Sequence, residues 1–360
     1  MKTTALTQRF FCMKTAVCTQ CAETPSRRTV FFRMKTAVCA ALALVLACIA
    51  AQGTAQTDTV SESALPPMQN VFPDGNKKLH ITYTDKVFPG DAVFIRLALE
   101  DGILEKAQAL LFVDTNEKVL ASAELYEVPP ADRGRLYIAL IPLSSWYEPE
   151  NFHIKLTYRL RGKKEKALSL PVAMQKKDFV SETVHLDAKN TAIRTNTADE
   201  KRQAQIKRLN DILGTVNYSA VYHSGQFGLP VTQTRRTSFF ADRRVYAYSN
   251  GKSATSLHYG IDFGVPEGTP VFSCGDGKVV LAENRISTGY SVVIEHLPGM
   301  YSLYYHLSSY SVKEGDTVKR GEQIGLSGAT GLATGPHLHW EVRLLGQAVN
   351  PDLFVQYFPN

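Results

Sequence analysis

The sequence is nearly free of cysteine once its first 55 residues are set aside. Five of the six cysteines lie in that leader, and only Cys274 follows it. A single cysteine cannot form an intramolecular disulfide, so packing alone must hold the rest of the chain together. Cys18 and Cys21 have the spacing of a metal or redox pair, which we attribute to chance in a leader without a core.

The sequence also lacks an excess of charge outside the leader. The net charge is +6, and the first 55 residues, with seven basic residues and one acidic residue, carry all of it. The remaining chain has 33 basic and 33 acidic residues (40 less 7, and 34 less 1). A chain without net charge offers no general attraction to phosphate backbones, so we expect no nucleic-acid partner.

Long apolar runs are missing as well. Residues 37–51 form an apolar run of 15 residues, whereas a membrane-spanning helix needs about 20. The run follows Met34-Lys35 and precedes the small residues at 53–55, which is the order of a secretory signal segment cleaved after Ala55. We therefore expect export to the periplasm or cell envelope.

Two features of the leader qualify that interpretation. The motif Met13-Lys14-Thr15-Ala16-Val17-Cys18 repeats at residues 34–39, so we interpret residues 1–33 as the result of a start codon placed too far upstream. The alternative to a soluble exported protein is a lipid anchor on Cys48, which would give a peripheral association with the membrane.

Alternating apolar and polar residues dominate the chain from 71 to 176, after a polar linker at 56–70. Val93, Ile95 and Leu97 illustrate the period of two, and turn residues such as Pro89-Gly90-Asp91 separate the runs. About seven short strands at this spacing predict an immunoglobulin-like β-sandwich. It has no cluster of catalytic residue types, and we expect it to contact envelope protein partners.

Residues 177–220 predict a short helical linker. Ile206, Leu209 and Leu213 form a narrow apolar stripe on a helix over residues 199–213, and Gly214 suits its C-terminal cap. We interpret this as a helix packed between two domains. The alternative is a helix that docks on an active-site groove and restrains the enzyme.

Glycine and proline punctuate short β runs throughout residues 221–360, which predicts an antiparallel β domain with tight loops. There is no Gly-x-Ser-x-Gly motif, and Cys274 has no neighbouring base in the sequence. We therefore exclude serine and cysteine catalysis. His185, His223 and His296 are expected to be ordinary core or surface residues.

Four other histidines and one aspartate in this domain suit a metal site. In a strand, His337 and His339 would share a face about 7 Å apart, so we expect one to bind the ion and the other to lie outside its first sphere. His258 and Asp262 would lie about 13 Å apart in an extended chain, so the backbone must turn between them, as Gly260 permits. Two imidazoles and a carboxylate suit Zn2+ and leave a position open for water. His306 and the non-ligand histidine would then transfer protons.

These motifs resemble those of the LytM or lysostaphin-type zinc endopeptidases of bacterial cell walls. The resemblance covers residues 258–353. The matching segments are His258-x-Gly260-Ile261-Asp262, Gly275-Asp276-Gly277-x-Val279, Ile294-Glu295-His296, Tyr304-x-His306-Leu307, Gly321-x-x-Ile324-Gly325, Ser327-Gly328-x-Thr330-Gly331 and Thr334-Gly335-Pro336-His337-Leu338-His339-Trp340-Glu341. Ala333 and Trp340 depart from the family pattern without removing a ligand.

The resemblance implies a mostly β chain whose C-terminal antiparallel domain is a LytM-type peptidase. It implies that His258, Asp262 and His339 bind one Zn2+ and that His306 and His337 are the catalytic histidines. Glu341, on the same strand face as His339, would support that ligand from outside the first sphere.

The implied reaction is hydrolysis of peptide bonds in peptidoglycan stems or cross-links, for cell-wall remodelling or division. One alternative is a non-hydrolytic envelope regulator that activates or recruits other wall hydrolases. Another is a secreted antibacterial or host-directed protease. Loops at residues 226–248 and 285–290 are expected to line the groove and to select the bond.

Overall fold

The computed structural model describes residues 68–73, 78–113, 118–129, 134–148 and 151–358. All of them belong to one compact unit, Val60–Asn360. The predicted leader, with its signal segment, Cys48 and the Cys18 and Cys21 pair, lies outside the described residues. Within the described ranges, no helix combines the length and the apolarity needed to cross a lipid bilayer.

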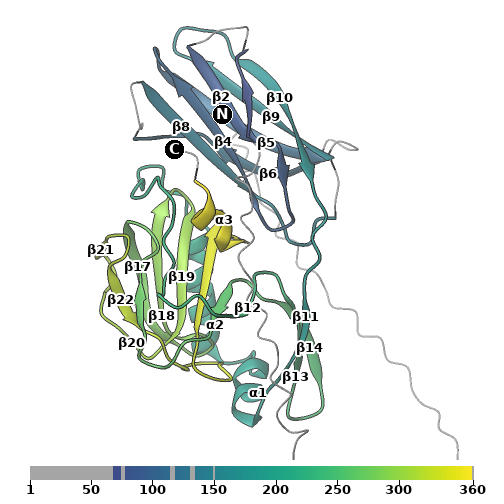
Figure 1. Cartoon of the computed structure of the whole chain (residues 1–360), viewed down its shortest axis with the longest axis vertical. Coiled ribbons are helices and arrows are strands. Elements are labelled where there is room, and N and C mark those ends of the chain that lie inside the picture. The colour runs from purple at the N-terminus through teal and green to yellow at the C-terminus, as the bar shows by residue number, and fades with distance from the viewer. Residues whose placement is uncertain (1–67, 74–77, 114–117, 130–133, 149–150, 359–360) are drawn as a thin grey trace, which may run out of the picture. The chain divides into compact units, whose positions relative to one another are not determined.

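Ten strands in the first part of the described chain form two five-stranded sheets (Figure 1). The first sheet has the order β1(Met68–Val71), β2(Leu79–Thr84), β4(Ala92–Leu99), β8(Arg135–Pro142), β7(Tyr126–Val128). The second has the order β3(Lys86–Val87), β10(Lys166–Met174), β9(Asn151–Leu160), β5(Leu104–Val113), β6(Val119–Glu124).

Both sheets contribute to one hydrophobic core, because Ile95 of β4 and Leu111 of β5 belong to the same buried cluster. The expectation of about seven strands was too low, since short strands such as β3 and β7 carry too few residues to show alternation. The first strand begins at Met68, inside the predicted linker at 56–70. The immunoglobulin-like assignment of this region stays a prediction.

An eight-stranded antiparallel sheet dominates the C-terminal part of the chain. Its order is β12(Arg236–Ser238), β15(Ile261–Phe263), β23(Leu338–Leu344), β19(Met300–Leu307), β18(Gly289–Leu297), β17(Gly277–Arg285), β21(Thr317–Val318), and β24(Gln347–Val349) also pairs with β23. A smaller sheet has the order β16(Pro270–Phe272), β22(Gln323–Leu326), β20(Ser309–Tyr310), and the helix α3(Pro351–Gln356) follows β24.

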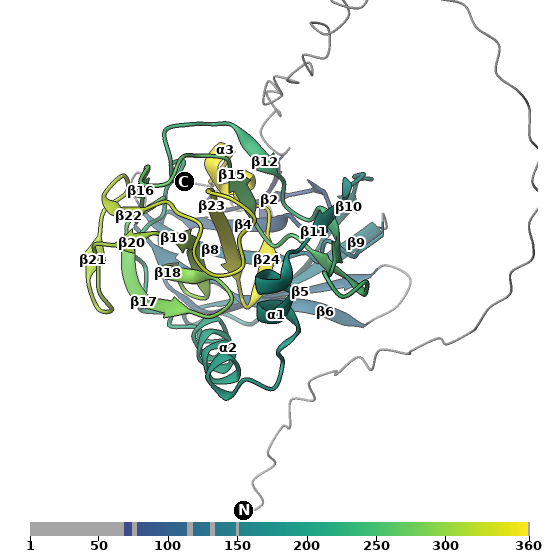
Figure 2. The same cartoon turned by 90° about the horizontal axis from the view of Figure 1, so that it is seen from below.

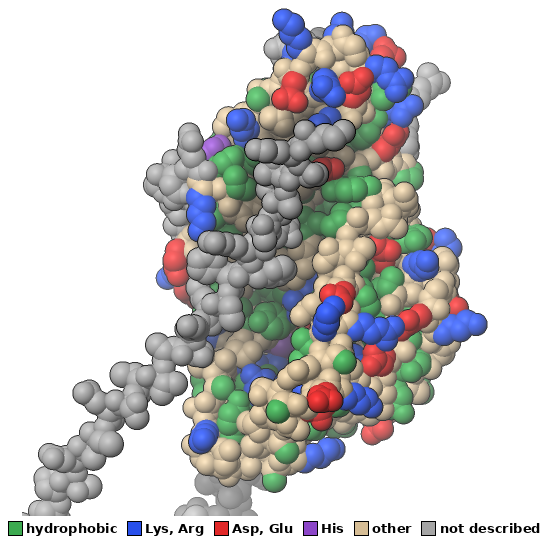
Figure 3. Space-filling model, turned by 180° about the vertical axis from the view of Figure 1, so that it is seen from behind, with side chains coloured by type: hydrophobic (Ala, Val, Ile, Leu, Met, Phe, Trp, Pro, Cys, Tyr) green, Lys and Arg blue, Asp and Glu red, His purple; other side chains and the backbone are tan. Residues whose placement is uncertain are grey.

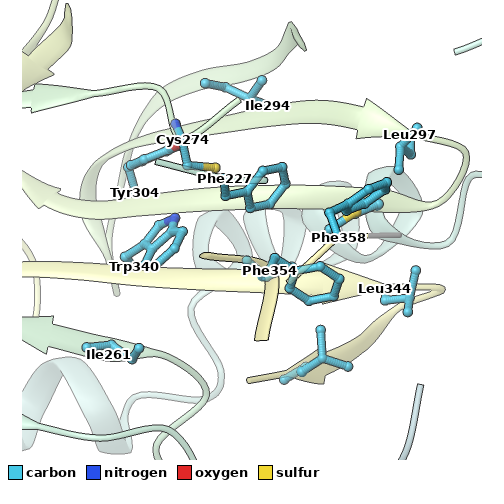
Figure 4. Packing of buried hydrophobic residues seen from close by; sticks show 14 of the residues in the cluster. Phe227, Ile261, Cys274, Ile294, Leu297, Tyr304, Trp340, Leu344, Phe354 and Phe358 are labelled. Atoms are coloured by element: carbon cyan, nitrogen blue, oxygen red, sulfur yellow. The ribbon is translucent and has the colours of Figure 1, made fainter. Parts of the chain in front are cut away.

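Large apolar side chains fill the core beside the central strands of this sheet (Figure 4). Trp340 of β23 and Tyr304 of β19 are fully buried there. Cys274 lies in the same core with its Sγ 3.7 Å from Nε2 of His296. The folded chain thus places a base beside the thiol, although none is close to it in the sequence. Burial raises the pKa of the Cys274 thiol to about 12, which keeps it protonated and unreactive. His296, expected to be an ordinary core or surface residue, is buried in this core.

The segment 177–220 is not purely helical, contrary to the prediction. It contains the strand β11(Ser181–His185) as well as the helices α1(Ala188–Thr195) and α2(Glu200–Leu213). β11 pairs in parallel with β13(Arg243–Ala247), which in turn pairs with β14(Ser253–Leu257). This strand could not be predicted, because its sequence Ser-Glu-Thr-Val-His has no apolar alternation. Its pairing with β13 stabilises it instead.

The second helix has the predicted ends, and two residues of the predicted stripe face inwards, since Leu213 is buried in an apolar cluster and Leu209 packs against it. The side chain of Asp199 accepts a hydrogen bond from the backbone N–H of Arg202, and Gly214 caps the C-terminus. Ile206 of the predicted stripe is 40% exposed, whereas Gln205 is buried and donates to the Glu283 carboxylate of β17. The helix lies beside β17 (Figure 2), where Glu283 offers the Gln205 amide a partner that the aliphatic side chain of Ile206 could not use.

Candidate active site

Neighbouring strands bring the three predicted metal ligands together. Asp262 of β15 and His339 of β23 are direct cross-strand partners, so both side chains project from the same face of the sheet. His258 follows the end of β14 and reaches the same place across the bend at Gly260. A Cβ on Gly260 would lie 2.3 Å from the carbonyl oxygen of Trp340. Gly260 is therefore needed because a side chain would block the close approach of the two backbones. Its φ is not positive, so a left-handed backbone is not the reason for the glycine.

The donor atoms of these three residues converge on one point. His258 Nε2 lies 2.9 Å from His339 Nδ1 and 3.1 Å from Asp262 Oδ1, and His339 Nδ1 lies 2.8 Å from the same oxygen. Tetrahedral Zn2+ with bonds of about 2.0–2.1 Å holds its donors about 3.3 Å apart. Outward shifts of a few tenths of an ångström would therefore fit the ion, and the three buried side chains form a candidate metal site.

Hydrogen bonds leave one ring nitrogen of His258 and one of His339 directed at the candidate metal site. Nδ1 of His258 donates to the carbonyl oxygen of Phe239 at 2.8 Å, which leaves Nε2 as the free donor atom. Nε2 of His339 donates to Glu341 Oε1 at 2.9 Å, which leaves Nδ1 facing the site. Arg343 in turn contacts Glu341. These contacts agree with the supporting role predicted for Glu341.

The same contacts set the charges of the site. Burial lowers the pKa of His258. Burial also opposes the charge on His339, but its hydrogen bonds to Asp262 and Glu341 outweigh that effect and raise its pKa to about 9. Burial opposes ionisation of Asp262, yet the two histidines hold its pKa well below the usual value. Asp262 therefore stays a carboxylate, the form that binds a cation.

Arg244 and Glu182 form a second support that the sequence did not indicate. Arg244 Nη2 donates to Asp262 Oδ2 at 2.7 Å, and its Nε donates to Glu182, which also accepts from Ser238 Oγ. Glu182 lies on β11 and Arg244 on β13, 62 positions apart, and the parallel pairing of these strands brings them together. No local spacing could have revealed this chain of contacts.

Replacing Arg244 with alanine is expected to weaken Zn2+ binding and activity by about 10- to 100-fold, as is usual when a ligand loses its hydrogen-bonded support. Asp262 would keep its bonding oxygen but lose the partner that fixes its rotamer. Competition with a chromophoric chelator measures the affinity. Lys252→Ala, at an exposed position of the β13–β14 hairpin, serves as the control. Unchanged affinity in Arg244→Ala would disprove the role.

A β-bulge turns the side chain of His306 towards the candidate metal site. In the pairing of β18 with β19, Tyr290 faces Leu307 and Val292 faces Tyr304, so a single residue of β18 opposes two of β19. His306 adopts a φ of 60°, which is rare for a residue other than glycine. Such strained backbone is found at functional sites.

His306 and His337 lie side by side, with ring centroids 4.8 Å apart. Nδ1 of His306 donates to the carbonyl oxygen of Thr330, and Nδ1 of His337 donates to that of Gly335, each at 2.8 Å. Both Nε2 atoms are therefore free to accept a proton. Burial, aided by the charges of neighbouring histidines, lowers the pKa of His306 to about 3 and keeps its imidazole neutral.

His337 does not lie in the regular strand that the sequence predicted. β23 begins at Leu338, and His337 forms only an isolated bridge with Gly328. Its Nε2 lies 3.8 Å from Asp262 Oδ1, outside the tight donor cluster. Of the two histidines in the His-x-His motif, His339 thus joins the candidate ligands and His337 faces them.

These groups open into a cleft of about 500 Å³. In the face drawn in Figure 3, histidine side chains are recessed beside Lys and Arg side chains. Both predicted groove loops line the cleft, through residues such as Thr237 and Ser287. The segment 177–220 lines it too, in line with the alternative of a helix docked on an active-site groove, and whether it restrains the enzyme stays a prediction. Its lining residues are Glu182, Val184, Leu186, Arg194 and Arg202.

Comparisons with known proteins agree with this geometry. Residues 256–351 match the model of Peptidase family M23. Over 116 residues, the chain is 45% identical to the peptidoglycan DD-endopeptidase ShyA of Vibrio cholerae, which covers 32% of this chain and 26% of that protein. Over 95 residues, it is 48% identical to the DD-carboxypeptidase/endopeptidase Mpg of Neisseria meningitidis, which covers 26% of this chain and 22% of that protein.

The chain thus matches only about a quarter of the length of these curated relatives. A crystal structure from Pseudomonas aeruginosa assigned to peptidase M23 covers 76% of this chain and 96% of its own, with 24% identity and a TM-score of 0.51, which shows a shared fold. The family predicted from the motifs is confirmed: residues 256–351 of this chain form a domain of Peptidase family M23.

Proposed function

We propose that this protein is an exported Zn2+ endopeptidase that hydrolyses peptide bonds in peptidoglycan stems or cross-links. The observation that carries the proposal is the convergence of His258, Asp262 and His339 in an open cleft, next to the imidazoles of His306 and His337. The family match supports a metallopeptidase, and relatives named peptidoglycan DD-endopeptidases support the substrate class.

In this proposal His258, Asp262 and His339 hold the metal ion through the three donor atoms that converge. Zn2+ bound there supplies Lewis-acid chemistry that polarises the scissile carbonyl and activates water. Glu341 and Arg244 keep the ligands in position through the hydrogen bonds described above.

The two remaining histidines move the protons. Nε2 of His306 or His337 accepts a proton from the attacking water, because both atoms carry a free lone pair. The same atom then returns the proton to the leaving nitrogen, so that an amine departs rather than an amide anion. Once protonated, an imidazole also stabilises the negative charge on the carbonyl oxygen.

The place of action follows from the leader and the substrate. The signal segment predicted at residues 34–55 favours action in the periplasm or cell envelope, where peptidoglycan lies. The two N-terminal sheets would then contact other envelope proteins, and a lipid anchor at Cys48 would restrict the enzyme to a membrane surface.

Digestion of purified peptidoglycan by the mature chain tests the proposal. Mass spectrometry of the fragments should show cleavage between peptide residues that stops with a zinc chelator and returns when Zn2+ is added back. Chelator-insensitive cleavage would contradict the metal role. No cleavage by a chain that contains zinc would contradict the enzyme and favour the non-hydrolytic regulator.

A further inference from the structure

Two arginines of the upstream segment line the cleft without an acidic partner. Arg194 lies on α1 and Arg202 on α2, and both contribute to the cleft wall. Among the residues that the structure describes, neither guanidinium makes an ion pair. Arg208, also on α2, differs because it contacts Glu283 and Glu314 outside the cleft.

The carboxylates of the cleft are all engaged elsewhere. Glu182 and Asp262 contact Arg244, and Asp262 also faces the histidines. Glu341 contacts His339 and Arg343. The guanidiniums of Arg194 and Arg202 therefore add positive charge to a cleft whose carboxylates are already paired with other side chains.

The position of Arg194 is well defined. Its guanidinium carbon lies 3.7 Å from the centroid of the Tyr246 ring, and its buried Nε has no hydrogen-bond acceptor. A guanidinium stacked on a ring keeps its N–H donors around its rim. Asn190 Nδ2, one turn earlier on α1, donates to the carbonyl oxygen of Ala333 at 3.1 Å, which fastens the helix to the loop before His337.

Arg202 lines the same cleft, between the C-terminal end of α1 and the loop next to His306. Its Nε donates to Ser287 Oγ at 3.3 Å, and its Nη1 donates to the carbonyl oxygen of Asn196 at 2.8 Å. The adjacent Thr288 carbonyl accepts the backbone N–H of His306. Both partners of Arg202 are neutral, so its charge is not compensated.

We propose that Arg194 and Arg202 form a subsite for a substrate carboxylate, so that the cleft prefers peptides with a free carboxylate close to the scissile bond. Guanidinium groups bind carboxylates through paired, charge-assisted hydrogen bonds, which a neutral amide cannot match. The proposal rests on the peptidase function and names the substrate feature that the cleft selects. The carboxylate is either the peptide's C-terminus or an acidic side chain.

The test uses the full mature chain with bound zinc and three versions of one soluble cross-linked stem-peptide dimer. The first keeps all its carboxylates, the second has its C-terminus amidated, and the third has its side-chain carboxylates amidated. The variants are Arg194→Gln, Arg202→Gln and the charge-preserving Arg194→Lys. Arg208→Gln is the matched control. Zinc content and the thermal unfolding midpoint show whether each variant is folded.

The wild type should cleave one amidated dimer about tenfold less efficiently than the free acid, through a higher KM, and that dimer identifies the source of the carboxylate. Arg194→Gln or Arg202→Gln should bring the ratio of kcat/KM for the free acid over the amidated dimer close to one, whereas Arg208→Gln should keep the wild-type ratio and Arg194→Lys should keep part of it. Equal cleavage of all three dimers by the wild type would overturn the subsite alone. Absence of cleavage of every dimer and of intact peptidoglycan would overturn the proposed function, and the subsite with it.

Discussion

His339→Ala is expected to remove the bound metal and all measurable activity. His339 supplies one of three converging donors, and its Nδ1 lies within 2.9 Å of both other donor atoms. With only His258 and Asp262 left, Zn2+ affinity should fall by more than the roughly 100-fold that loss of an outer contact costs. Elemental analysis of the dialysed protein measures bound zinc, and peptidoglycan digestion measures activity.

His185→Ala provides the matched control, because His185 is an exposed histidine on β11 that does not line the cleft. This variant should keep one zinc ion per chain and full activity. If His339→Ala retained stoichiometric zinc, the ligand assignment would be wrong, and His337 would be the member of the pair to examine next.

His306→Ala is expected to keep the metal and lose turnover by about 10²- to 10⁴-fold, the usual contribution of a proton-transferring group. The Nδ1 of His306 is engaged with Thr330, and its ring lies beside His337 rather than among the three donors. The loss should therefore appear in kcat, with zinc content unchanged.

The left-handed backbone at His306 calls for a second variant. Alanine is disfavoured at a φ of 60°, whereas asparagine tolerates this region. His306→Asn should therefore fold at least as well as His306→Ala and be equally inactive. Loss of zinc together with turnover in the asparagine variant would mean that His306 belongs to the metal site.

The sequence predicted the site through the resemblance of its short motifs to those of a known family, which spans residues 258–353. Asp262 and His339 meet because two short strands pair directly, and the His-x-His spacing already separated a ligand from its neighbour. The close approach at Gly260 was less visible, since the sequence indicated a flexible turn and the structure shows a steric requirement. The roles of these residues as ligands and catalysts stay predictions until the variants are measured.

Features that depend on distant pairing could not be predicted. Glu182 meets Arg244 only because β11 joins β13 in parallel, and β11 has no apolar pattern of its own. The bulge that turns His306 arises from a register shift between β18 and β19, and the register of a strand pair cannot be predicted from the sequence of either strand alone. On α2, the apolar stripe correctly predicted that Leu209 and Leu213 face inwards, but it also selected Ile206, whose place is taken by Gln205 because Glu283 lies opposite.

The wall formed by β11, α1 and α2 bears on how the substrate preference of the proposed peptidase can change. That wall comes from residues 181–213, whereas the proposed ligands and catalytic histidines all come from residues 256–351. Substitutions at Arg194 or other cleft-facing wall residues can change which peptides are admitted, whereas Glu182 is tied to the metal site through Arg244. A protein trimmed to residues 221–360 would keep every proposed ligand and catalytic histidine but lose Glu182 as the partner of Arg244, so we expect both its peptide preference and its zinc affinity to differ from those of the parent.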